Sequence, residues 1–142
     1  MLRVVLGVVA GFIVWSILWL GSDNLLSIFS GWYGQHQTAF EAAVSNRQPF
    51  APNSFVLIIG LIRSVVCSLI SGFSAVSVAR EKMKTPLMLG VLLLVFGIFV
   101  EAAFWNYVPL WYQISFLFLL IPVTFIGGIN KNLHSARPVL RS

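Results

Sequence analysis

Residues 55–79 read FVLIIGLIRSVVCSLISGFSAVSVA, an apolar run that contains one arginine and several serines. A run of this length meets the ~20 residues that an α-helix needs to cross about 30 Å of hydrocarbon. Backbone groups in lipid must find their hydrogen bonds within their own segment, so the run predicts a helix and not a strand. Similar apolar stretches precede and follow it, and we expect four spans at about residues 4–26, 55–79, 87–104 and 110–129.

The composition places all four spans in one membrane domain. Of the 142 residues, 58% are hydrophobic and only 9% are charged, whereas soluble domains carry about a quarter charged residues. The mean hydropathy is +0.93, and a single small core cannot bury that much apolar surface, so the excess must face lipid. We therefore predict an all-α fold over residues 1–142, an integral membrane four-helix bundle. The first span lacks a small-residue cleavage site, so we expect a retained anchor; the sequence leaves open whether its helix breaks at Gly21–Ser22.

The basic residues predict the orientation. The positive-inside rule places the side richer in Lys and Arg in the cytoplasm. One side would hold seven basic residues and the other only Arg47; the seven are Arg3, Arg80, Lys82, Lys84, Lys131, Arg137 and Arg141. We predict cytoplasmic termini, an outer loop at about residues 34–53 with one or two helical turns within 38–44, and a bacterial inner membrane. The basic clusters are expected to contact anionic lipid headgroups and not nucleic acid.

Small residues predict which helix faces meet. At 100° per residue, the glycine and serine positions of residues 55–79 gather on one half of the helix, opposite the large apolar side chains. Small and hydroxylated residues let helix backbones approach closely in a membrane. The alternative is that the serines only bond back to their own helix. The predicted packing positions are Gly7, Gly11, Ser64, Ser68, Ser71, Gly72, Gly90 and Gly97.

Arg63 is the charge that needs an explanation. It lies about nine residues inside its span, and an unpaired arginine near the bilayer centre costs roughly 2.5–3.5 kcal/mol on insertion scales. We predict a polar cluster in which Arg63 pairs with Glu101, with Asp23 as a second acceptor and Gln113 nearby. The cluster would act as a structural clamp or as a site for a proton, an ion or a polar ligand.

Residues that carry chemistry elsewhere are sparse. A lone Cys67 excludes an internal disulfide and CxxC chemistry, and His36 and His134 belong to opposite sides of the predicted membrane. No nucleophile with a base, phosphate loop or dinucleotide motif is found, so we expect no catalytic residues, metal or cofactor. The sequence favours a non-enzymatic accessory or interaction subunit that acts as a homodimer or with a partner membrane subunit. The alternative is a small homodimeric transporter or channel that uses Arg63, Glu101 and Asp23.

Overall fold

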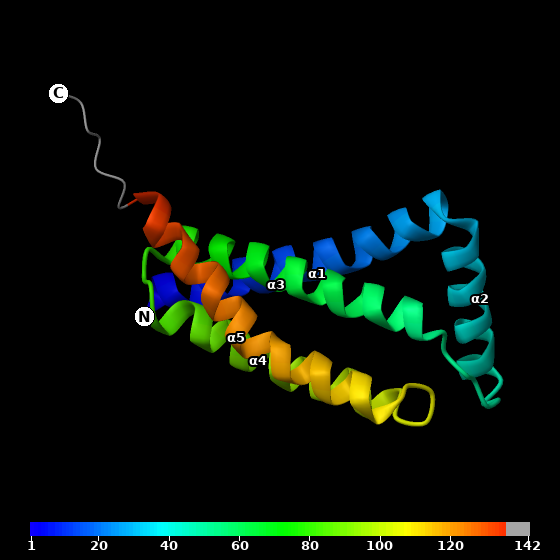
Figure 1. Ribbon diagram of the computed structural model, residues 1–142. Helices are drawn as coiled ribbons and strands as arrows, with labels where there is room; N and C mark the ends of the chain where they lie inside the picture. The colour runs from blue at the N-terminus through cyan, green and yellow to red at the C-terminus, as the bar shows by residue number, and fades with distance from the viewer. Residues whose placement is uncertain (136–142) are drawn as a thin grey trace.

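The computed structural model describes residues 1–135, which form five helices and no strand (Figure 1). These are α1 (Leu2–Phe29), α2 (Gly31–Ser45), α3 (Ser54–Ala79), α4 (Lys84–Ala103) and α5 (Leu110–Ser135). All except α2 are long and apolar enough to cross a membrane. The predictions of an all-α fold and of four helices long and apolar enough to span a membrane are thus confirmed.

α1 does not break. It continues through Gly21–Ser22 to Phe29, and the hydroxyls of Ser16 and Ser22 donate to carbonyl oxygens of their own helix, at 2.9 and 3.0 Å. The helix ends at Ser30, where the backbone becomes extended. With 28 residues α1 is longer than the hydrocarbon core requires, so its last turns extend to the level of α2.

The predicted outer loop is wrong in its extent of helix, because most of it belongs to α2. A helix of 15 residues stands where one or two turns were expected, and it begins at Gly31. The Ser30 hydroxyl accepts a hydrogen bond from the Tyr33 backbone N–H at 3.4 Å, which caps the new helix. Tyr33, Gln37, Phe40 and Val44 recur every three or four residues and present one face of α2 to the bundle.

The helices alternate in direction along the bundle. Figure 1 shows α2 lying across one end of the bundle, where the turn between α4 and α5 also lies. The start of α1 and the turn between α3 and α4 lie at the opposite end, and they carry Arg3 and the Arg80, Lys82 and Lys84 group. Arg137 and Arg141, and the side chain of Lys131, lie outside the described residues.

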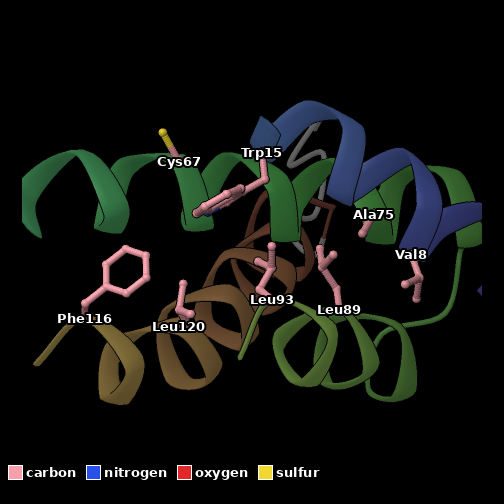
Figure 2. Close-up of a cluster of buried hydrophobic side chains, with 8 residues drawn as sticks. All are labelled: Val8, Trp15, Cys67, Ala75, Leu89, Leu93, Phe116 and Leu120. Atoms are coloured by element: carbon pink, nitrogen blue, oxygen red, sulfur yellow. The ribbon is translucent and has the colours of Figure 1, made fainter. Parts of the chain in front are cut away.

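α3 is the central helix and packs against both α1 and α5. Its small residues point inward, since Gly60, Ser64, Ser68, Ser71 and Gly72 are all buried. The opposite side of α3 exposes large apolar side chains, among them Ile58, Ile62, Val66, Ile70 and Phe73. Figure 2 shows the apolar cluster that fills the space between the helices: Val8, Trp15, Cys67, Ala75, Leu89, Leu93, Phe116 and Leu120.

The glycines mark close approaches between helices. A methyl group at Gly7 would meet Ala79 of α3, and one at Gly11 would meet Leu89 of α4. At Gly90 and Gly97 of α4 the nearest atoms belong to α5, namely those of Ile121, Leu117 and Leu120.

Of the serines of α3, some contact other helices and some bond back to their own helix. Ser68 accepts a hydrogen bond from the Trp15 indole of α1 at 3.3 Å, whereas Ser71 donates to the Ser68 carbonyl of its own helix. The Ser64 hydroxyl is buried and has no hydrogen-bond partner in the described part of the chain. Helix contact and back-bonding therefore coexist on one face of α3.

Substitution of Gly72 tests the contact between α3 and α5. An added methyl group would collide with the Thr124 carbonyl oxygen, which belongs to backbone and cannot swing away. We expect Gly72→Ala to lower the free energy of unfolding by about 1–3 kcal/mol. Gly21→Ala is the matched control, because no atom outside its own helix turn lies within 4 Å; it should stabilise α1 by up to ~1 kcal/mol. Unfolding in detergent, followed by circular dichroism, measures both changes, and equal effects would contradict the close contact.

Candidate functional site

A cavity of about 650 Å³ lies at the α2 end of the bundle, and all five helices contribute to its wall. The wall is mostly apolar and aromatic. Three acidic residues, Asp23, Glu41 and Glu101, share it with one arginine, Arg63. The aromatic lining residues are Trp15, Trp19, Tyr33, Phe40, Phe96, Phe104, Tyr112 and Phe116.

Arg63 reaches from α3 to α1, where it meets one turn of that helix. Its Nε donates to the Ser22 hydroxyl at 3.0 Å and its Nη2 to the Trp19 carbonyl oxygen at 2.7 Å. Its Nη1 lies 2.9 Å from the Asp23 Oδ1. The guanidinium carbon also sits 4.5 Å from the centre of a Trp19 ring, a cation–π contact. Because each nitrogen has an acceptor, the arginine is satisfied without water or lipid headgroups.

α2 completes the arrangement with Tyr33 and Gln37. The buried Tyr33 hydroxyl accepts from the Arg63 Nη1 at 2.7 Å and donates to the Asp23 Oδ1 at 2.7 Å. The Gln37 Nε2 donates to both the Asp23 oxygen and the Tyr33 oxygen, at 2.9 and 3.0 Å. Burial, together with the hydrogen bond to Asp23, raises the pKa of Tyr33 to about 12, so the phenol stays protonated and remains a donor.

The arginine's partner differs from the sequence prediction. Among the described residues Arg63 forms its ion pair with Asp23 and not with Glu101. The reason is the unbroken α1, which brings the Trp19 carbonyl, Ser22 and Asp23 to the guanidinium together. Four polar groups on α1 and α2 then accept hydrogen bonds from the three nitrogens of Arg63, and among the described residues none of these bonds goes to α4.

No side chain of the described residues pairs with Glu101. Its side chain is 8% exposed and lines the cavity, and within the described residues it has neither a hydrogen bond nor an ion pair. Its neighbours on the lining face of α4 are Phe96, Gly97, Val100 and, just beyond the helix, Phe104. An ionised carboxylate in such surroundings is costly unless a cation meets it.

Gln113 has a different role from the predicted one. It is 2% exposed, and its Nε2 donates to the Val108 carbonyl at 3.0 Å and more weakly to the Trp105 carbonyl at 3.4 Å. The side chain thus braces the turn between α4 and α5, whose backbone carbonyls have no helical partner there. Gln113 therefore does not belong to the Arg63 cluster.

His36 joins α2 to the start of α3. Its Nε2 accepts a hydrogen bond from the Asn53 backbone N–H at 3.1 Å, and its ring meets Phe50 edge-on. The Asn53 side chain in turn caps α3 through the Phe55 N–H. Burial lowers the pKa of His36, and the accepting Nε2 requires the neutral ring.

Tyr33, Gln37 and Trp19 are site residues that the sequence interpretation did not single out. The signal in α2 was the spacing of Tyr33, Gln37 and Phe40, which is helical but fell in a stretch expected to be loop. No comparable signal marks Trp19, since it contributes a backbone carbonyl and a ring face.

Within the part of the chain that the structure describes, no group of three or more His, Cys, Asp or Glu residues is arranged to hold a metal ion. Comparison of the chain with protein-family models, with curated proteins and with solved structures finds no match. The cavity and its charges are therefore the features from which a function can be inferred.

The two acidic residues of the predicted cluster should behave differently on neutralisation. Asp23→Asn leaves the Arg63 charge without its counter-ion. We expect a loss of about 1–3 kcal/mol, less than for a fully buried pair, because the Asp23 side chain is 37% exposed. Glu101→Gln removes no ion pair and replaces an unpaired buried acid by a neutral group, so it should not lower the unfolding free energy. Thermal unfolding in detergent compares them; a loss at Glu101→Gln equal to that at Asp23→Asn would restore the pairing predicted from sequence.

The stability of the α2 attachment should depend on pH through His36. Because the folded pKa lies below the ordinary value of 6.5, the unfolded form binds more protons, and stability is lost as pH falls through 6.5. Amide exchange of α2 should therefore quicken between pH 7.5 and 5.5. In His36→Gln this pH dependence should shrink, and an unchanged profile in that variant would exclude His36 as its source.

Proposed function

We propose that the chain is a non-enzymatic integral membrane protein that binds a small amphipathic molecule in the cavity at the α2 end, as part of a transport process. The observation that carries this proposal is the aromatic cavity with the Glu101 carboxylate in its wall, which has no partner among the described residues. A volume of about 650 Å³ lies within the roughly 300–1,000 Å³ of small-molecule sites, and such sites are apolar with a few placed polar groups.

The alternative is the accessory subunit that the sequence favours, which would need a face that a partner helix could pack against. Gly7, Gly11, Gly72, Gly90 and Gly97 instead face other helices of this same chain. The surface left for a partner consists of large apolar side chains, which lipid covers equally well.

The proposed setting is the bacterial inner membrane with both termini in the cytoplasm. Arg3 and the Arg80, Lys82 and Lys84 group support this orientation, because the segments that carry them lie at the end opposite α2. The cavity would then open in the outer half of the membrane, and the basic residues would contact anionic headgroups on the inner side. A homodimer is the assembly we propose for transport.

Filling the cavity tests the proposed function. Val100 lines the cavity, whereas Val95 of the same helix is exposed away from the core, so Val100→Phe and Val95→Phe add the same ring at different places. The probes are tetraphenylphosphonium, neutral triphenylphosphine oxide and tetraphenylborate, applied to protein in zwitterionic nanodiscs with empty nanodiscs subtracted. At least one probe should bind saturably, one per chain, and Val100→Phe should weaken it at least about tenfold while Val95→Phe does not.

Two results would contradict the proposal. Saturable binding of none of the three probes is one. The other is a stoichiometric foreign subunit that co-purifies with the tagged protein in mild detergent and covers the α2 end, which would favour the accessory role.

A further inference from the structure

The geometry points to a hydrophobic organic monocation as the ligand of this cavity, with the Glu101 carboxylate as its counter-ion. This inference rests on the proposed function and adds the chemical class of the ligand. It is carried by three features of the described residues: the missing partner of Glu101, the charges of the lining and the aromatic wall.

Glu101 is the most buried of the three acids that line the cavity. The side chains of Asp23 and Glu41 are more exposed, and Asp23 is already occupied by Arg63, Tyr33 and Gln37. Glu101 has no such partner within the described residues and sits beside the apolar Val100 and Phe104. A cationic group that enters the cavity would supply the missing charge.

The charged residues of the cavity wall favour a positively charged ligand. Three carboxylates line the cavity against one guanidinium. The Arg63 charge is neutralised by Asp23 at 2.9 Å, and all three of its nitrogens already donate to protein acceptors. The buried acid left without a cation among the described residues is Glu101. An anionic ligand would be repelled by its carboxylate, and a neutral ligand would leave it without a counter-ion.

The aromatic wall selects the kind of cation. Ring faces attract cations, most strongly when both are out of water, and Arg63 over Trp19 is one such contact in this wall. Trp15, Phe96, Tyr112 and Phe116 add further aromatic surface from three helices. A divalent metal ion takes six or more oxygen ligands, and one buried carboxylate in an apolar wall does not offer them. A single positive charge spread over or shielded by an apolar body fits both the wall and the one acid.

The experiment compares charge at nearly constant shape. Equilibrium dialysis with wild-type protein in zwitterionic nanodiscs, corrected with empty nanodiscs, measures tetraphenylphosphonium, triphenylphosphine oxide and tetraphenylborate. We expect the phosphonium ion to bind at least about tenfold more tightly than the other two. Glu101→Gln should weaken phosphonium binding at least about tenfold. Glu41→Gln, at the exposed part of the same wall, should change it by less than about threefold. Glu101→Asp retains the charge and should keep part of the affinity. The thermal midpoint of each variant shows that it is folded.

The outcomes separate this inference from the proposed function. Equal or tighter binding of the neutral probe or of the borate overturns the cation inference, while saturable binding itself still supports a ligand cavity. Phosphonium binding that Glu101→Gln leaves unchanged overturns the role of Glu101 as counter-ion. Absence of binding by all three probes overturns both proposals.

Discussion

The arrangement of this chain depends on how a guanidinium is satisfied inside an apolar bundle. Arg63 stands in the first half of α3, between helices that offer few polar groups. Lipid cannot solvate it, so every donor needs an acceptor from the protein. One turn of α1 supplies the Trp19 carbonyl, Ser22 and Asp23, and α2 supplies Tyr33. This single side chain therefore links three helices at one end of the bundle.

The cavity follows from a difference in residue size along the bundle. At the end away from α2, Gly7, Gly72, Gly127 and Gly128 let backbones approach until no room is left for a methyl group. At the α2 end the facing positions hold Trp19, Phe104, Tyr112 and other large rings, which keep the helices apart. Figure 1 shows the α4–α5 pair diverging from α1 and α3 toward that end. Small residues thus close one end, and α2 spans the other.

The four spans and the inward face of α3 could be predicted from the sequence, because both depend on patterns of residue type along the chain. The partner of Arg63 could not. The sequence placed Asp23 and Glu101 at similar depths in the membrane, so either could have paired with Arg63. Which of them does so depends on whether α1 continues through Gly21–Ser22. α1 does continue through these residues as one helix, which the sequence alone left open. α2 was predicted only as one or two turns within residues 38–44, because a short helix depends on tertiary contacts that the sequence does not show.

Asp23 and Glu101 affect the stability of the fold in opposite ways. Asp23 stabilises the fold, because without it the Arg63 charge would have no counter-ion among the described residues. Glu101 has no structural task that the described contacts show, and a leucine in its place would bury apolar surface at no electrostatic cost. Departures from the rule that a buried polar group is satisfied concentrate at functional sites, since stability is lost there in exchange for binding. Because Arg63 is already paired with Asp23 and Tyr33, the proposed cationic ligand is the charge that would meet Glu101.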